Sequence, residues 1–540
     1  MANTVMTSFK SELLSGVHDF ATAGDTFKLS LYTSSSTINN ASTTIYTTSD
    51  EVAKEKDKSK IKRRTVMKGA VAASAVLSMP MILTGIKRAE AASGPVKIGH
   101  IEDLSGNIAV YGVQKWHAAQ LAVKEINEGK ALKGGPVGSG GLGSLGKFAG
   151  NAPIMGNGDK DLKFVNKGGS QSGSGMVYVE DDDTFIDSGD SGILGREVKL
   201  IGPDGQSNWN VWQQLCKKLI QEDKVDCLVA GFTSASREAI RPIVDRYKQL
   251  YFYTNQYEGG VADSNTFCTG AICEQQVIPV VDYMVKRFGP RIYTLAADYN
   301  FGQLTAAWTK AFAPLVGGTI IEEEFAPLSM SDFTTSISRI QAAKPDWVFT
   351  LLVGSNQSNY YPQAHSAGME FPMASTVNMA QGYEHRRFKP PSLNRMYNCV
   401  NYIEEVPTAR NRAFVKRWYD MFPNDPYIGQ MAQNTYFSIH WYAQACRLAG
   451  TTNQEDVKMA MESGIHIEAP EGTVFMEPSS HHATHYIRLA SSDADHNVSF
   501  VREWPYIQPW WLQRIGVNLV KHKEYHQYTP DEDPFFSKFS

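Results

Sequence analysis

The stretch from Leu228 to Gly259, LVAGFTSASREAIRPIVDRYKQLYFYTNQYEG, gives the clearest indication of the fold. It opens on a short apolar run, which is typical of a buried strand, and continues with the hydroxyl residues Thr233, Ser234 and Ser236. Apolar residues at helical spacing follow, and a second apolar run at 250–253 ends in a polar loop. This order of strand, loop, helix and strand predicts one β-α-β unit.

The predicted start of that helix offers a place for an oxygen atom of a ligand. The first backbone N–H groups of a helix are unpaired and carry partial positive charge, so they can receive a carbonyl or carboxylate oxygen. The hydroxyls at 233–236 can equally serve only to cap the helix. The local sequence leaves both interpretations open.

The same alternation of strand and helix patterns extends on both sides of this unit. Further strands are predicted at 96–101, 196–201, 292–297, 319–325 and 347–352. Repeated β-α units predict an α/β fold with parallel sheets that carry helices on both faces. Ligands of such sheets bind at the carboxyl ends of the strands, where the polar loops that contain Thr233, Thr254, Asp298 and Val353 are expected.

Length and composition exclude several classes of protein. A chain of 540 residues is too long for a single core and predicts at least two domains. The net charge of −4, spread over the chain, gives no electrostatic footprint for nucleic acid. The six cysteines form no C-x-x-C pair, which argues against zinc ribbons and thioredoxin-like sites. Cys268 and Cys273 are close enough in sequence to form a small disulfide in an exported protein.

The N-terminal residues differ in character from the rest of the chain. Residues 1–60, rich in Ser and Thr, are interpreted as an extension that is unrelated or disordered. Residues 61–91 contain Arg63 and Arg64, then a weakly apolar run, and end in a small-x-small cleavage pattern. They are typical of a twin-arginine signal peptide, whereas a permanent membrane span is disfavoured because the run is short and interrupted by Pro80. We therefore expect a periplasmic protein exported by the twin-arginine route.

A glycine-rich insertion is predicted at 130–191. Residues 134–175 contain fourteen glycines in forty-two positions, so the segment cannot bury enough apolar surface to offset its ordering entropy. It includes the pattern G-x-G-x-x-G at 141–146, but no strand precedes this pattern and no helix follows it, as a dinucleotide site requires. We expect a flexible insertion that is dispensable for folding and for binding.

Catalytic patterns are missing from the sequence. It contains neither a G-x-S-x-G elbow nor a Walker loop, and no nucleophile–base pair supports an amidase. The cluster His481, His482 and His485 follows a turn in a predicted β hairpin, which favours a structural or an exposed role over a metal site. We expect no enzyme activity, no cofactor and no metal.

Six short motifs carry a resemblance to a known family. They are GFTSASR at 231–237, YTNQYEG at 253–259, FCTG at 267–270, DYNF at 298–301, AKPD at 343–346 and APEG at 469–472. With these motifs the chain resembles the type I periplasmic solute-binding proteins, in the branch that binds urea and short-chain amides. The resemblance covers residues 95–504 except for the insertion at 130–191.

The resemblance implies two Rossmann-like lobes joined by three hinge crossovers. Lobe one would comprise 95–267 and 402–475, and lobe two 268–401 and 476–504, followed by a tail at 505–540. It also implies a function, which is to capture urea or a short-chain amide outside the cytoplasm and to deliver it to the permease subunits of an ABC importer.

The resemblance further implies which residues line the ligand cleft. They are Phe232, Ser234, Tyr253 and Asn255 from lobe one, and Tyr299, Phe301 and Val353 from lobe two. Aromatic faces can enclose a planar amide, and a serine hydroxyl and helix N–H groups can meet its carbonyl. An asparagine oxygen or backbone carbonyls can accept hydrogen bonds from its NH₂ group.

Two related functions stay open. A receptor for branched-chain or other amino acids would need a carboxylate beside the ligand ammonium, and Asp298 or Glu384 could supply it. The stretch 378–384 departs from the usual pattern of the family, which leaves the ligand open. An intracellular amide sensor would share the cleft but would have no need of the export signal.

Overall fold

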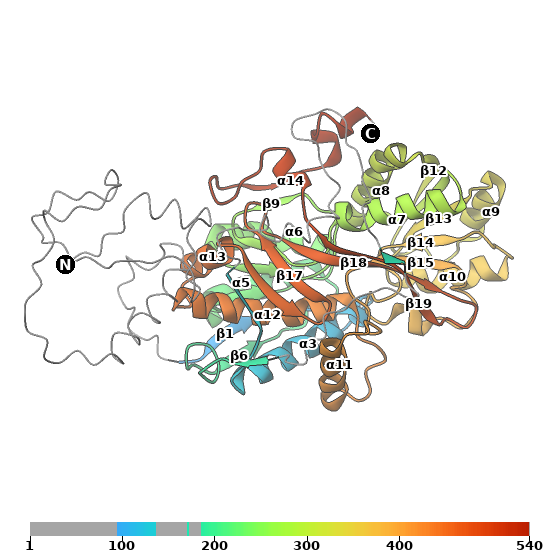
Figure 1. Cartoon of the computed structure of the whole chain (residues 1–540). Coiled ribbons are helices and arrows are strands. Elements are labelled where there is room, and N and C mark those ends of the chain that lie inside the picture. The colour runs from blue at the N-terminus through green and yellow to red at the C-terminus, as the bar shows by residue number, and fades with distance from the viewer. Residues whose placement is uncertain (1–93, 137–169, 172–184, 539–540) are drawn as a thin grey trace, which may run out of the picture. The chain divides into compact units, whose positions relative to one another are not determined.

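The computed structural model describes residues 94–136, 170–171 and 185–538 (Figure 1). The predicted extension at 1–60 and the predicted export signal at 61–91 lie outside these residues, as does most of the glycine-rich insertion. No helix within the described ranges is long and apolar enough to span a membrane.

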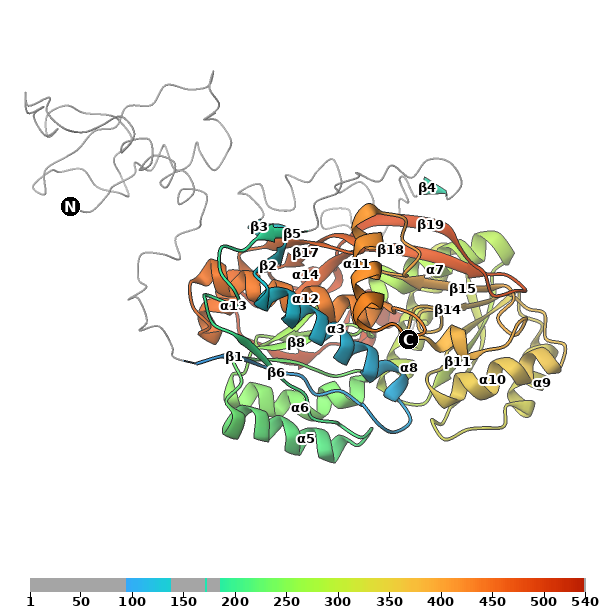
Figure 2. The ribbon, with the colours of Figure 1, turned by 90° about the horizontal axis from the view of Figure 1, so that it is seen from below.

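A first parallel sheet contains the β-α-β unit predicted at 228–259. Its strands lie in the order β6 (Val198–Ile201), β1 (Val96–Gly99), β7 (Cys227–Val229), β8 (Tyr251–Tyr253) and β10 (Thr266–Cys268). Helices α5 (Trp209–Lys218) and α6 (Ser234–Tyr247) cover one face, and α3 (Ala109–Asn127) and α12 (Gln430–Ala449) cover the other (Figure 2). Ligands of sheets with this strand order bind at the carboxyl ends of the strands, beside the point where the order reverses.

A second parallel sheet repeats this order. It runs β12 (Thr319–Ala326), β11 (Arg291–Ala297), β13 (Trp347–Leu351), β14 (Met373–Ser375) and β15 (Met396–Val400). Its helices are α7 (Cys273–Phe288), α8 (Asn300–Phe312), α9 (Thr334–Ala343) and α10 (Ser355–Ser366). Along β11, Ile292 and Ala296 join one apolar cluster while Tyr293 and Leu295 join another, because successive side chains of a strand point to opposite faces. Both faces of this sheet are therefore buried.

The chain then returns to the first sheet and crosses once more to the second. The returning elements are α11 (Ala409–Met421), α12, α13 (Gln454–Glu462), β16 (Ile465–Ala469) and β17 (Gly472–Glu477). Strand β18 (His482–Ser492) begins parallel to β10 and ends antiparallel to β15, so it links the two sheets. Strand β19 (Val498–Ile507) pairs with β18, and the predicted hairpin around 477–482 is formed by β17 and β18.

The described ends of the glycine-rich insertion are paired strands, and there the predicted flexible loop is wrong. Strand β2 (Lys130–Leu132) pairs with β5 (Phe185–Asp187), β3 (Gly134–Pro136) with β16, and β4 (Ser170–Gln171) with β19. A Cβ atom on Gly134 would lie 2.3 Å from the carbonyl oxygen of His466, so β3 can approach β16 closely because it is built from glycine. Backbone hydrogen bonds to strands such as β16 and β19 thus hold these ends of the insertion, although their glycine-rich sequence buries little apolar surface.

All six cysteines are buried and free. The disulfide considered for Cys268 and Cys273 is therefore not formed: Cys268 ends β10, and Cys273 begins α7 beside Thr305. Burial raises the pKa of the Cys268 thiol to about 12, so it behaves as a small apolar side chain rather than as a reactive thiolate.

The C-terminal residues pack against both sheets' helices and loops. Strand β20 (Tyr525–Gln527) pairs antiparallel with β9 (Val261–Asp263), which follows β8 in the chain. The short helix α14 (Trp511–Arg514) brings Trp511 edge-on to Trp308 of α8, with ring centroids 4.4 Å apart. The tail predicted at 505–540 is thus an integral part of the packed structure over its described length.

Candidate functional site

The seven residues predicted to line a ligand cleft lie at or directly beyond the carboxyl ends of parallel strands. Phe232 and Ser234 follow β7, Tyr253 ends β8 and Asn255 follows it; Tyr299 and Phe301 follow β11, and Val353 follows β13. This is the edge at which α/β sheets bind ligands.

The residues of the first sheet are held together by the carbonyl of Phe232. Its oxygen accepts a hydrogen bond of 2.8 Å from the Tyr253 hydroxyl and one of 2.6 Å from Asn255 Nδ2. Asn255 Oδ1 in turn accepts from Gln381 Nε2 at 3.0 Å. Both ends of the Asn255 amide are therefore engaged within the protein, and its oxygen keeps one lone pair beyond the bond from Gln381.

Ser234 differs from its expected role. Its hydroxyl donates to Glu258 Oε2 at 2.5 Å, so its hydrogen is directed to this carboxylate and not to a ligand carbonyl. The oxygen of Ser234 accepts a long hydrogen bond of 3.4 Å from Arg237 Nη1, and its second lone pair can accept from a further N–H group. The first backbone N–H groups of α6 remain as donors for a carbonyl, since the Thr233 side chain caps only Ser236 N.

A fully buried ion pair supports this arrangement. Arg237 Nη2 lies 2.7 Å from Glu258 Oε1, and both side chains are 0% exposed. Burial opposes the charge of Arg237, but the carboxylates of Glu258 and Glu238 outweigh it and hold the pKa of the guanidinium above its usual value. The guanidinium carbon also lies 5.0 Å from the ring centroid of Tyr253 and 4.5 Å from that of Tyr257. Arg237 is therefore already paired.

The residues of the second sheet form an aromatic group. Phe301 and Val353 are buried in one apolar cluster, and the partly buried ring of Tyr299 packs on it, 6.1 Å from the ring of Phe301. Burial, and then the neighbouring Tyr253 and Glu258, raise the pKa of the Tyr299 hydroxyl. Tyr299 thus lies within electrostatic range of the residues from the first sheet.

Tyr111, on α3, contacts a predicted ligand residue, and the sequence did not reveal this contact. Its ring stacks on Phe232 with centroids 3.9 Å apart and an interplanar angle of 8°. Its hydroxyl donates to Glu384 Oε1 at 2.6 Å and accepts from Gly354 N at 3.0 Å. A tyrosine on the buried face of a predicted helix looks like an ordinary core residue, and only the tertiary structure brings it to Phe232.

The two carboxylates considered as partners of a ligand ammonium are both engaged. Asp298 is exposed and accepts from Gln303 Nε2 at 2.8 Å. Glu384 is buried and contacts Tyr111 with one oxygen and Arg387 with the other, at 3.1 Å. Burial raises the pKa of Glu384, although Tyr111 and Arg387 partly offset this effect.

The three histidines of the hairpin region are buried and individually hydrogen bonded. His481 contacts Glu462 at 3.0 Å, His482 contacts Tyr257 at 2.5 Å, and His485 contacts Glu471 at 2.8 Å. Within the described residues no group of three or more His, Cys, Asp or Glu side chains could hold a metal ion. Of the two roles expected for the histidines, these contacts fit the structural one, and burial excludes an exposed position.

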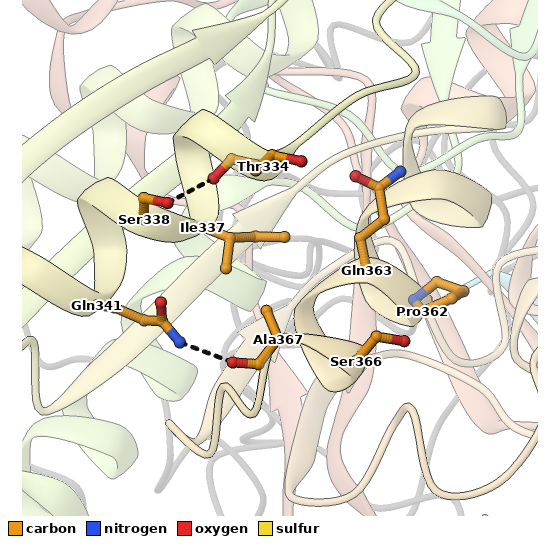
Figure 3. A pocket seen from close by; sticks show the side chains of 8 residues that line it. All are labelled: Thr334, Ile337, Ser338, Gln341, Pro362, Gln363, Ser366 and Ala367. Atoms are coloured by element: carbon orange, nitrogen blue, oxygen red, sulfur yellow. Dashed lines mark hydrogen bonds between the residues drawn. The ribbon is translucent and has the colours of Figure 1, made fainter.

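A cavity of about 430 Å³ lies elsewhere, between α9 and α10 (Figure 3). Uncharged residues line it: Thr334, Ile337, Ser338, Gln341, Pro362, Gln363, Ser366 and Ala367. Ser338 Oγ donates to Thr334 O, and Gln341 Nε2 donates to Ala367 O. None of the seven predicted ligand residues contributes to this cavity, so we do not assign it to the ligand.

Comparison with known proteins identifies both a family and a fold. The family model described as "Periplasmic binding protein" matches residues 95–497. Similar solved structures include a solute-binding protein of an ABC transporter from Rhodopseudomonas palustris in complex with 3,4-dihydroxybenzoic acid. That match has 19% identity and a TM-score of 0.58, and covers 77% of this chain and 98% of the other.

A second similar structure is the branched-chain amino acid transporter substrate-binding protein LivJ from Streptococcus pneumoniae in complex with isoleucine. It has 15% identity and a TM-score of 0.57, with 76% of this chain and 99% of the other covered. A periplasmic binding protein from Burkholderia mallei has 16% identity and a TM-score of 0.59, with coverages of 76% and 95%. At these identities the likeness concerns the fold, and it confirms the predicted α/β architecture.

Proposed function

The chain belongs to the periplasmic binding protein family, and we propose that it is the substrate-binding protein of an ABC importer for urea or a short-chain amide. Members of this family bind a solute and do not transform it, so the chain is not an enzyme. The proposed role is to capture the solute in the periplasm and to deliver it to the permease subunits of the importer.

The charges around the predicted ligand residues are already paired with one another, and this pairing supports a neutral solute. Arg237 is paired with Glu258, Glu384 with Tyr111 and Arg387. A ligand carboxylate or ammonium group would enter beside these pairs without a counter-charge of its own, at a cost of several kcal/mol when desolvated. A neutral amide avoids that cost.

The hydrogen-bonding groups match an amide. The first N–H groups of α6 can donate to its carbonyl. Ser234 Oγ and Asn255 Oδ1 each accept one hydrogen bond within the protein and can each accept a second from its NH₂ group. The rings of Phe232 and Tyr299 supply flat apolar surface for a planar solute, and Tyr111 supports Phe232 by stacking on one of its faces.

An amino-acid receptor is the second candidate, because the fold resembles that of the isoleucine-bound LivJ protein. Its ligand would need an unpaired carboxylate for the ammonium group. The two candidates for that role, Asp298 and Glu384, already have partners, which is why we favour the amide.

Calorimetric titration of the purified mature protein with urea, acetamide, isoleucine and 3,4-dihydroxybenzoate tests the proposal. A solute of about four heavy atoms gains at most ~1.5 kcal/mol per atom, so the best dissociation constant expected for urea or acetamide is on the order of 10–100 µM. Binding of isoleucine or the aromatic acid, with no heat from either amide, would replace the amide by that ligand class.

A further inference from the structure

We infer that Gln527, in the C-terminal residues 508–538, is a positioning residue of the ligand site that acts through Glu258 on Ser234. This inference rests on the proposed function, since it names a further residue of the same site. None of the motifs in the sequence pointed to this part of the chain.

The C-terminal residues reach the site through strand pairing. Gln527 on β20 lies opposite Val261 on β9, and Tyr528 N donates to Gly260 O at 2.8 Å. Gly260 has φ +85°, and a Cβ atom there would lie 2.0 Å from Tyr528 O, so only glycine permits this close approach. At the other end of the pair, Ser264 N donates to Glu524 O at 3.0 Å. The register of β20 is therefore fixed on both sides of Gln527.

The side chain of Gln527 bridges the buried ion pair. Its Nε2 donates to Glu258 Oε1 at 2.8 Å and to Gly259 O at 3.1 Å, and its Oε1 accepts from Arg237 Nη2 at 3.2 Å. Glu258 Oε1 thus receives donors from both Gln527 and Arg237. The second oxygen of the carboxylate is left for the Ser234 hydroxyl.

This geometry links the C-terminal residues to the ligand. A carboxylate held at one oxygen by two donors has a defined orientation, and its other oxygen then fixes the rotamer of Ser234. The hydrogen of Ser234 is directed to Glu258, and its oxygen, which accepts from Arg237 Nη1 at 3.4 Å, has one lone pair left for a ligand N–H group. Without Gln527, Glu258 loses one of these donors and Ser234 loses part of its positional support.

The same C-terminal residues are anchored on the second sheet's helices, which keeps β20 in place. Trp511 packs edge-on against Trp308 of α8. The ring centroid of Phe536 lies 5.3 Å from that of Phe312 of the same helix. Directly before these residues, the carbonyl of Ile507, at the end of β19, accepts a hydrogen bond of 2.7 Å from Gln275 Nε2 on α7. Figure 1 shows α14 next to β9, and the last described residues pack on α8.

The first test compares Gln527→Ala with His526→Ala in titrations of the full mature protein with acetamide and urea. His526 is the matched control, since it lies on the same strand but points to Glu532 at the surface. We expect Gln527→Ala to weaken binding about 3- to 20-fold, the effect of losing hydrogen bonds to a charged group, and His526→Ala to change it less than twofold. Equal affinities for Gln527→Ala and wild type would overturn the inference.

A double mutant separates positioning from a general structural effect. If Gln527 acts through Ser234, then adding Gln527→Ala to Ser234→Ala should change the affinity less than twofold further. The same loss in both backgrounds would mean that Gln527 acts elsewhere, and the inference would be wrong. Should Gln527→Ala fail to fold, Gln527→Asn replaces it, because Asn keeps the amide on a side chain that is one methylene shorter. Its affinity is then compared with and without Ser234→Ala, and the same outcomes support or refute the inference.

A ligand-free measurement keeps this inference distinct from the proposed function. We expect Gln527→Ala, but not His526→Ala, to speed amide hydrogen exchange at residues 232–238 and to leave exchange in β11 unchanged. If the wild type binds neither urea nor acetamide, the proposed function fails while this measurement still tests the coupling. Unchanged exchange at 232–238 would refute the coupling even if acetamide binds.

Discussion

The Tyr111 hydroxyl donates a 2.6 Å hydrogen bond to Glu384 Oε1, and the two residues are 273 positions apart in the chain. The ring of Tyr111 also stacks on Phe232, so one side chain joins a predicted ligand residue to a buried carboxylate. This contact engages Glu384, one of the two carboxylates that could pair with the ammonium group of an amino-acid ligand. It therefore connects the tertiary structure directly with the choice of ligand class.

Tyr111→Phe tests this contact. The substitution keeps the stacking on Phe232 but removes the donor to Glu384 and the acceptor for Gly354 N. Leaving buried polar groups without a partner should lower the free energy of unfolding by about 1–3 kcal/mol, measured with guanidinium chloride. Tyr419→Phe, which removes a hydroxyl bonded to the half-buried Glu404, is a control with a smaller expected effect. A stability equal to wild type would show that the contact contributes nothing.

Glu274 should make stability depend on pH. Burial raises the pKa of Glu274 from its ordinary 4.5 to about 7, and within the described residues neither carboxylate oxygen has a hydrogen-bond partner that would favour its charged form. Between these values the folded protein binds more protons than the unfolded chain, so this group lowers stability as pH rises from about 4.5 to above 7. The whole pKa difference between the folded and the unfolded state corresponds to a loss of roughly 3 kcal/mol in the free energy of unfolding.

Glu274→Gln removes that titration. Relative to wild type, the variant should gain stability between pH 5 and pH 8, which guanidinium unfolding at the two pH values would measure. Glu455→Gln, at an exposed position on α13, should not produce such a change. If wild type and Glu274→Gln differ in their free energy of unfolding by the same amount at both pH values, Glu274 does not titrate in this range.

The sequence was informative where structure is local. The strand predicted at 292–297 is β11, at 291–297, and the strand predicted at 347–352 is β13, because apolar runs between turns leave little choice of structure. The same periodicity could not reveal Tyr111 or Gln527. Their roles depend on partners far away in the chain, Glu384 for the first and Glu258 for the second.

The insertion illustrates the same limit. Composition predicted a flexible segment, since so many glycines cannot bury apolar surface. Strand β3 is nevertheless ordered because its backbone groups pair with β16, and composition contains no information about a partner strand more than 300 residues away.

Export by the twin-arginine route is predicted from residues 61–91 alone. The export machinery of this route recognises the arginine pair itself. Changing Arg63 and Arg64 together to lysine should therefore trap the precursor inside the cell. Cell fractionation and immunoblotting would measure this, with Lys60→Arg as a control that leaves the pair intact. Normal periplasmic accumulation of the double variant would contradict the prediction.

The insertion is predicted to be dispensable for binding. Replacing residues 137–184 by a short Gly-Ser linker keeps β2, β3 and β5 and, of the described strands, removes only the two-residue β4 from the edge of β19, and should leave both stability and amide affinity close to wild type. Joining Gly129 to Gly192 also removes the pairing of β3 with β16, and should cost about 1–2 kcal/mol of stability without loss of affinity. Loss of ligand affinity in either variant would show that the insertion takes part in binding.

Tyr299 and Asp298 separate the two ligand classes. For a neutral amide, Tyr299→Ala should weaken binding by about 1–3 kcal/mol, or roughly ten- to a hundredfold, because one face of a solute with so few atoms is left in water. Asp298→Asn should keep most of the affinity, since Asp298 is exposed and bonded to Gln303 rather than directed at a solute. Both effects are measured by titration with urea and acetamide.

The opposite outcome has an equally definite meaning. If the wild type ignores both amides and binds leucine or isoleucine, and Asp298→Asn abolishes that binding, Asp298 must release Gln303 to pair with the ligand ammonium. The same titrations on Glu384→Gln complete the comparison, because Glu384 is the second carboxylate considered for an ammonium group and would have to release Tyr111. An amide ligand requires neither release, and this is the physical reason for expecting Tyr299, and not an acid, to control affinity.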